Sequence, residues 1–306
     1  MRLAPGARAW TQTLALTTRD GVGLRGALWA EGTRGLVVVL PGRTEFLEKV
    51  AILAGALQAR GFAVASLDWR GQGQSARLVE PPAKSHVGCF SEYHLDLQAL
   101  LDAPEVAALG APRLVLAHSM GATVALGARE AGVLGAIPTV YSAPMLAIRM
   151  ALPTRAFALT VMAMGRRLGL ETRWPPLPGA ATPYVLGAHA QNNTLTFDKE
   201  VFAWLVEAHH AEPRIALGLP SIGWFLAAEA AMAKARALGP LDGAMVCLLG
   251  QRECVVASAP VHAFAARQGM ALIEIPRARH DLFLEGEPMR SQAWAAVDAF
   301  LAREGL

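Results

Sequence analysis

Short apolar runs alternate with segments of helical spacing along most of this 306-residue chain. The apolar runs fall at residues 36–40, 62–67, 113–117, 136–141, 244–249 and 271–275, and the helical segments at residues 46–60, 91–101, 120–130, 258–268 and 290–302. An alternating hairpin pattern at residues 12–17 and 24–29 precedes them. Strands that alternate with helices pair in parallel through right-handed crossovers. The sequence therefore predicts an α/β fold with a mostly parallel, doubly wound sheet of about eight strands.

One long insertion interrupts this alternation after the sixth strand. Residues 144–240 are rich in Met, Ala, Leu, Trp and Pro and have the pattern of helices joined by irregular loops. We expect a helical cap at residues 144–240 between two parts of one core, residues 1–143 and 241–306. In doubly wound sheets the ligand lies beyond the carboxyl ends of the strands, so this insertion is positioned to cover the site.

Composition and charge exclude several classes of function. The formal net charge is only +3, and basic residues are scattered singly, whereas a nucleic-acid-binding protein would cluster them. No apolar stretch reaches the ~20 residues that span a bilayer, and the N-terminus lacks the apolar core of a signal peptide. The three cysteines, Cys89, Cys247 and Cys254, form no CxxC pair and are too few for a disulfide framework. We expect a cytoplasmic protein that does not bind nucleic acid.

The pentapeptide AHSMG at residues 117–121 lies directly between an apolar run and a helical segment. This is the context of a nucleophile elbow, a sharp strand-to-helix turn that exposes a serine and needs small residues two positions to either side. Ser119 is therefore the predicted nucleophile, and its neighbour His118 is expected to point away from the reaction. The alternative is a chance match in a chain rich in alanine and glycine.

A serine nucleophile needs a base to take its proton and an acid to orient that base. In folds with this elbow the acid and then the histidine follow the serine, each after a later strand. Only His280 follows the last strand-like run, and Glu253 follows the run before it. These two residues are the predicted base and acid, although Glu253 could instead be a solvated surface carboxylate.

The remaining histidines do not suggest a metal. His209 and His210 are adjacent in a helical stretch of the cap, where neighbouring side chains face different sides, and His262 falls within another helix. No ligand set of suitable spacing accompanies them. We expect no metal and no cofactor.

Acyl transfer also needs two backbone N–H groups directed at the developing oxyanion. One comes from the residue after the serine, here Met120, and the other from the loop after an early buried strand, here Arg43 in the sequence LPGRTE at residues 40–45. The alternative for that loop is an ordinary strand-to-helix turn.

Five motifs together resemble one family. They are PGRTE at residues 41–45, DWRGQGQS at 68–75, AHSMG at 117–121, GQRECVV at 250–256 and RHDLFLE at 279–285. They are similar to those of α/β-hydrolases of the bacterial lysophospholipase and monoacylglycerol-lipase-like branch, of the serine aminopeptidase S33 type. The chain departs from that family at Pro41, Ala117 and Glu253, where His, Gly and Asp are usual.

The resemblance implies the α/β-hydrolase fold and hydrolysis of a carboxylic ester, with a monoacyl lipid as substrate and a covalent acyl-enzyme on Ser119. Met145, in an apolar part of the cap, and Trp224, in a motif that resembles the family's caps, are expected substrate contacts. The alternative is that such residues pack the cap against the core. The apolar cap also suggests transient contact with a membrane surface, and the oligomeric state stays open.

Two other functions remain open at this point. Family relatives include serine aminopeptidases and iminopeptidases, which need a carboxylate to hold a free amine; Glu45, Glu171 and Glu207 are the candidates. The third alternative is a hydrolase-shaped binding protein without catalytic activity.

Overall fold

The computed structural model of the protein describes residues 3, 4 and 6–306. Within those residues one eight-stranded sheet has the order β1-β2-β4-β3-β5-β6-β7-β8. The strands are β1 (Gln12–Thr17), β2 (Gly23–Trp29), β3 (Leu36–Leu40), β4 (Ala63–Leu67), β5 (Leu114–His118), β6 (Thr139–Ser142), β7 (Met245–Gly250) and β8 (Ala271–Ile275). β2 pairs antiparallel with β1 and β4, and the other neighbours pair in parallel. The predicted α/β sheet is confirmed.

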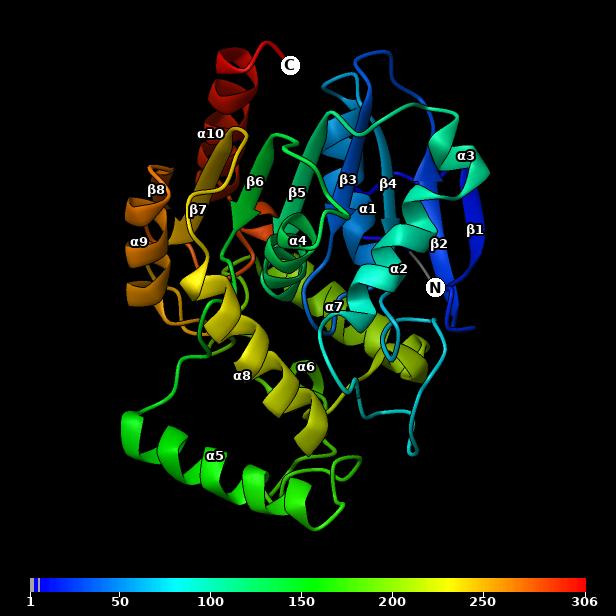
Figure 1. Ribbon diagram of the computed structural model, residues 1–306. Coiled ribbons are helices and arrows are strands. Elements are labelled where there is room, and N and C mark those ends of the chain that lie inside the picture. Colours follow the sequence, from blue (N-terminus) through cyan, green and yellow to red (C-terminus); the bar gives the residue numbers. More distant parts are fainter. Residues whose placement is uncertain (1–2, 5) are drawn as a thin grey trace.

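Helices cover both faces of the sheet (Figure 1). A hydrophobic core lies between the sheet and the helices on each face. Alternation along β3 shows the division: Val37 and Val39 face one core, and Leu36, Val38 and Leu40 face the other, as period-two side chains must. The first core includes α1 (Leu47–Gln58) and α10 (Met289–Arg303). The second includes α2 (Glu92–Leu101), α3 (Pro104–Ala107), α4 (Met120–Glu130), α8 (Ile222–Ala237) and α9 (Ser258–Arg267).

One strand begins later than the sequence predicts. We expected a strand over residues 136–141, but β6 begins at Thr139. Pro138 has no N–H to donate to the ladder. The carbonyl of Ile137 instead accepts a hydrogen bond of 2.8 Å from Arg129 Nη1. The carboxyl end of β6 is unaffected, and it is this end that lies beside the elbow.

The insertion between β6 and β7 lies beyond the carboxyl ends of the parallel strands (Figure 1). Its elements are α5 (Leu152–Arg167), α6 (Tyr184–Gly187), α7 (Lys199–Ala211), the 3-10 helix η1 (Pro213–Ile215) and α8. The Asp198 carboxylate caps α7 by accepting from the amides of Glu200 and Val201, and the Ser221 hydroxyl caps α8 by accepting from Trp224. None of the helices among the described residues has both the length and the apolar content needed to cross a membrane.

The last helix of the insertion is buried against the sheet. Ala228, Met232 and Ala235 of α8 lie in the same core as α4, whereas α5 packs only against the outer side of α8, through Met162, Ile222 and Phe225. The division of the chain at residues 144 and 240 stays a prediction, and α8, within the predicted cap, packs in the same core as α4.

Candidate active site

Ser119 lies at the turn between β5 and α4 with a φ of 50° and a ψ of −115°. Positive φ is strained for a residue with a Cβ and persists only where surrounding bonds impose it. Here the Ser119 amide donates to Ser142 O at 3.0 Å, and the Ser119 carbonyl accepts from Met145 at 3.1 Å. A Cβ at Gly121 would lie 2.2 Å from Leu40 O, so α4 can approach β3 only with glycine there. The strand, the turn and the helix expected of an elbow are all present.

His280 and Glu253 are brought together from two loops, as the sequence predicts. Nδ1 of His280 lies 2.7 Å from Oε2 of Glu253, and both side chains are buried. The other carboxylate oxygen, Oε1, accepts from the amides of Val255 at 2.6 Å and Val256 at 3.1 Å. Burial opposes ionisation of Glu253, but the His280 charge and these amides outweigh it and lower the pKa of Glu253. Glu253 is therefore fixed as an anion that can orient an imidazole.

Ser119 and His280 both adjoin His118. The rings of His118 and His280 have centroids 4.8 Å apart, and His118 directly precedes Ser119 in the chain. Among the described residues no hydrogen bond joins the Ser119 hydroxyl to His280. In unliganded hydrolases this bond is often long and shortens only with substrate present.

Two backbone amides near Ser119 have no acceptor among the described residues, those of Arg43 and Met120. The amides on either side of Arg43 are occupied, because Gly42 donates to the Glu45 carboxylate and Thr44 donates to Gln72 Oε1 at 2.7 Å. A Cβ at Gly42 would lie 3.1 Å from Ser119 Cβ, so this loop lies against the serine. The two free amides are those that the sequence analysis selected.

The two expected substrate contacts are buried. Met145 is 5% exposed and its amide anchors the elbow, and Trp224 is 2% exposed with its Nε1 donating to Tyr93 Oη at 2.9 Å. Both belong to the core that contains α4 and α8. Their role as substrate contacts stays a prediction.

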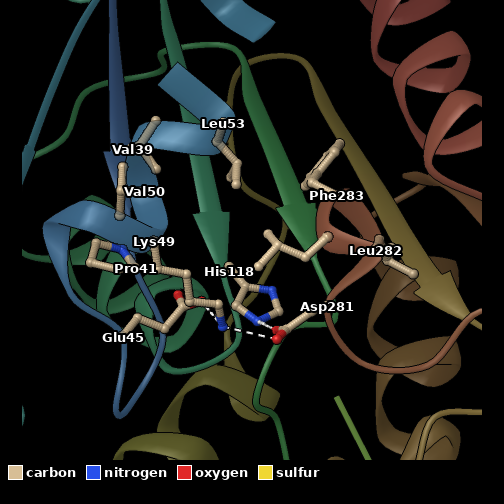
Figure 2. Close-up of a pocket in the computed structure, with 11 residues that line it drawn as sticks. Val39, Pro41, Glu45, Lys49, Val50, Leu53, His118, Asp281, Leu282 and Phe283 are labelled. Atoms are coloured by element: carbon tan, nitrogen blue, oxygen red, sulfur yellow. Dashed lines mark hydrogen bonds and ion pairs between the residues drawn. The ribbon is translucent and has the colours of Figure 1, made fainter. Parts of the chain in front are cut away.

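A cluster of charged side chains lies behind the elbow, and sequence reasoning missed it (Figure 2). Lys49 Nζ contacts Glu45 Oε1 at 2.6 Å and Asp281 Oδ2 at 2.8 Å, and Asp281 Oδ1 lies 3.0 Å from His118 Nε2. The one signal in the sequence was the four-residue spacing of Glu45 and Lys49, which is common on helices. These residues also line a cavity of about 20 Å³, room for about one water molecule.

The opposite charges of the cluster stabilise one another. Burial disfavours every charge in it, but Lys49 and His118 hold the pKa of Asp281 well below its ordinary value. For His118 burial acts downward, and Glu45 and Asp281 outweigh it to raise the pKa of His118. His118, His280 and Asp281 have possible metal-ligand atoms within 4.8 Å of one another. Lys49 in direct contact with Asp281 opposes a bound cation there.

The three histidines that the sequence analysis set aside, His209, His210 and His262, lie away from the predicted triad, and two of them have other partners. Nδ1 of His209, on α7, lies 2.7 Å from Leu205 O, one turn earlier in the same helix. His210 follows it on α7, and His262, on α9, pairs with Glu274 at 3.1 Å. None of the three is joined to Ser119 or Glu253 by a hydrogen bond among the described residues.

Comparison with known sequences gives one family. The family model described as "Serine aminopeptidase, S33" matches residues 31–287. Lysophospholipase L2 of Escherichia coli (strain K12) is 30% identical, over 88% of this chain and 80% of that protein. The probable lysophospholipase L2 of Haemophilus influenzae is 27% identical, over 88% and 84% of the two chains.

Comparison with solved structures gives the same fold at low sequence identity. A soluble variant of monoglyceride lipase from Saccharomyces cerevisiae has a TM-score of 0.70 at 17% identity, over 97% of this chain and 98% of that one. A thermostable carboxyl esterase from Bacillus coagulans has a TM-score of 0.72 at 16% identity, over 96% and 98%. The resemblance predicted from the five motifs is thus confirmed: the chain belongs to the serine aminopeptidase S33 family and has the α/β-hydrolase fold.

Proposed function

We propose that the protein is a serine hydrolase that cleaves carboxylic esters of monoacyl lipids through an acyl-enzyme on Ser119. The observation that carries the proposal is the buried Glu253–His280 pair at 2.7 Å, in a fold whose elbow presents Ser119 beside two free amides. The relatives named lysophospholipase and the carboxyl esterase among the structural neighbours support an ester as the bond cleaved.

The reaction follows from these positions. Ser119 Oγ forms a bond to the ester carbonyl carbon while its proton passes to Nε2 of His280. Glu253 stabilises the imidazolium, and the amides of Arg43 and Met120 donate to the oxyanion. The alcohol leaves with the proton from His280, and the acyl group stays on Ser119. Water then attacks the acyl-enzyme, His280 takes a water proton and returns it to Ser119, and the fatty acid departs.

Hydrolysis of an aminoacyl amide is the second candidate, and the structure offers it little support. Such a substrate needs a carboxylate free to hold its amine. Glu45 is occupied by Lys49 and the Gly42 amide, Glu171 pairs with Arg166 at 3.3 Å, and Glu207 is exposed on α7. None of these carboxylates is both free and buried beside Ser119.

The cap supplies a surface for contact with lipid. Leu152, Phe157 and Met164 of α5 are exposed by 80%, 69% and 59%, and Arg166 and Arg167 end the same helix, which contains no acidic residue. An apolar face bordered by arginines suits the surface of a membrane with anionic lipids. We propose that the enzyme acts from the cytoplasm, since Cys89 and Cys254 are exposed free thiols.

A substrate panel tests the proposed bond and substrate class. We expect 1-monoacylglycerols, lysophosphatidylcholine and p-nitrophenyl acyl esters to be hydrolysed, and aminoacyl p-nitroanilides to be cleaved at least 100-fold more slowly. Release of fatty acid and of p-nitroaniline is the measurement. Faster cleavage of the anilides than of every ester would replace the ester assignment with the aminopeptidase one.

A further inference from the structure

The side chain of Arg43 is a cation that no carboxylate neutralises. Nε donates to Ser85 Oγ at 3.2 Å, Nη2 donates to Gly218 O, and the guanidinium lies over the Trp224 ring at 5.4 Å from its centroid. No ion pair involves Arg43 among the described residues. Arg43 is half-buried, and a charge withdrawn from water without a counter-ion is costly.

Three other cations withdrawn from water are each paired with two carboxylates, whereas Lys84, which is buried, is in no ion pair among the described residues and lies over the Trp174 ring. Arg25 contacts Glu48 and Asp68, Lys49 contacts Glu45 and Asp281, and Arg70 contacts Asp20 and Asp96. Burial lowers the pKa of Arg43 to about 10, with Tyr93 acting the other way. Arg43 therefore keeps its positive charge at neutral pH.

Arg77 also lacks a carboxylate partner, but backbone carbonyls accept hydrogen bonds from its side-chain nitrogens. Its Nε, Nη1 and Nη2 each donate to a backbone carbonyl, of Pro82 at 2.9 Å, Ser75 at 2.9 Å and Gly73 at 2.6 Å. Nη1 of Arg43, by contrast, donates to no described residue and keeps some exposure to solvent.

The free Nη1 donor belongs to a residue whose backbone lies beside the reacting serine. Its own amide is one of the two free amides beside Ser119, so the residue presents a donor to the ester carbonyl and a cation further along its side chain. The number of covalent bonds from the backbone nitrogen of arginine to the guanidinium carbon equals the number from the ester carbonyl carbon of a 1-acyl glycerophospholipid to its phosphorus. Guanidinium also matches phosphate oxygens in a forked geometry.

We propose that the Arg43 guanidinium binds the phosphate group of a monoacyl phospholipid whose ester carbonyl is held by the amide of the same residue. This assignment rests on the proposed function and deepens it, because it separates phosphate-bearing substrates from neutral monoacylglycerols. Trp224, which lies under the guanidinium, then acts as its support and not as a direct substrate contact.

Substrate selectivity tests the proposal. The values of kcat/KM are measured for lysophosphatidylcholine and for a 1-monoacylglycerol of the same acyl chain, below their micelle concentrations. In Arg43→Gln the ratio of the two should fall by about 10- to 100-fold, mainly through KM for the phospholipid, as expected for a lost charge-assisted hydrogen bond. Arg43→Lys should restore part of the ratio, and the control Arg77→Gln should leave it unchanged.

The results distinguish failure of the phosphate assignment from failure of the proposed function. If the wild type cleaves neither lipid, the proposed function fails. If it cleaves both and Arg43→Gln slows both equally, Arg43 only fastens the loop at Gly218 and the phosphate assignment is overturned.

Inhibition of the hydrolysis of a soluble ester is a second test, and it uses no lipid substrate. Glycerophosphocholine should inhibit hydrolysis of p-nitrophenyl butyrate by the wild type, and its inhibition constant should rise at least tenfold in Arg43→Gln, with glycerol as the uncharged control. Equal inhibition by inorganic phosphate at the same concentration would show that Arg43 selects a free anion, which contradicts a lipid headgroup.

Discussion

Two of the residues that we place in the reaction, Ser119 and His280, have a neighbour in the chain that belongs to the charge cluster. His280 faces Glu253, whereas the next residue, Asp281, faces Lys49 and His118. Ser119 likewise follows His118. Because a peptide bond joins each pair, a shift of the cluster must move the serine and the histidine. The cluster is therefore suited to holding the two catalytic loops at a fixed spacing.

Substitution of Glu253 by Gln tests its part in orienting His280. The amide oxygen can still accept from Val255 and Val256, so the loop should stay folded, but the imidazolium loses its counter-charge. We expect kcat to fall by about 10³- to 10⁴-fold. The assay is hydrolysis of p-nitrophenyl butyrate, with thermal unfolding as the folding control. A loss of less than about tenfold would mean that another carboxylate orients the base.

Substitution of His118 by Gln tests the charge cluster through pH. Glu45 and Asp281 raise the pKa of His118 in the folded state, so its contribution to stability is fully present below the ordinary histidine pKa of about 6.5 and is lost as pH rises through the raised value. Lys49 also faces this ring and acts against its charge, and the His280 ring lies beside it. His118→Gln should therefore cost more stability at pH 6 than at pH 9.

Urea unfolding of wild type and variant at the two pH values is the measurement. His262→Gln is the matched control, because that exposed histidine also pairs with a glutamate. An equal loss at pH 6 and pH 9 would show that His118 is neutral in the folded protein and that its contacts are only hydrogen bonds.

At the scale of elements, α5 differs from the other helices of the cap. Its buried residues, Met162 and Gly165, pack against α8. Phe157 and Met164 are seven residues apart and so lie on one face, which is exposed. A long helix that leaves such residues in water is suited to rest on lipid.

The double variant Phe157→Ser, Met164→Ser tests that contact. We expect wild type to co-sediment with vesicles of phosphatidylcholine and phosphatidylglycerol, and the variant to bind at least fivefold more weakly because two apolar side chains no longer enter the interface. Hydrolysis of soluble p-nitrophenyl butyrate should be little changed in the variant. Equal sedimentation of both proteins would remove α5 as the contact surface.

At the scale of the whole molecule, local patterns in the sequence carry most of the fold. The buried strands are runs such as LVVVL at β3 that alternate with segments of helical period, so parallel pairing through right-handed crossovers follows from general rules. The same rules gave the loops of Glu253 and His280. The start of β6 was wrong because Pro138 removes a ladder donor.

Pairings between distant segments were not predictable in this way. Glu45, Lys49, His118 and Asp281 come from three separate parts of the chain, and each has an ordinary local explanation, so only the folded structure shows that they meet. The sequence likewise left open whether Trp224 contacts the substrate or packs in the core. Its segment resembles a cap motif, but α8 packs beside α4 and carries the side chain into the core.

The most direct test of the account is covalent labelling of the serine. A fluorophosphonate probe reacts with a serine only when a base activates it and an oxyanion site receives the phosphonyl oxygen. We predict stoichiometric labelling of the wild type, with the adduct located on Ser119 by peptide mass spectrometry, and none in folded Ser119→Ala. Absence of labelling in the folded wild type, or an adduct on another serine, would contradict the proposed site and favour a hydrolase-shaped binding protein.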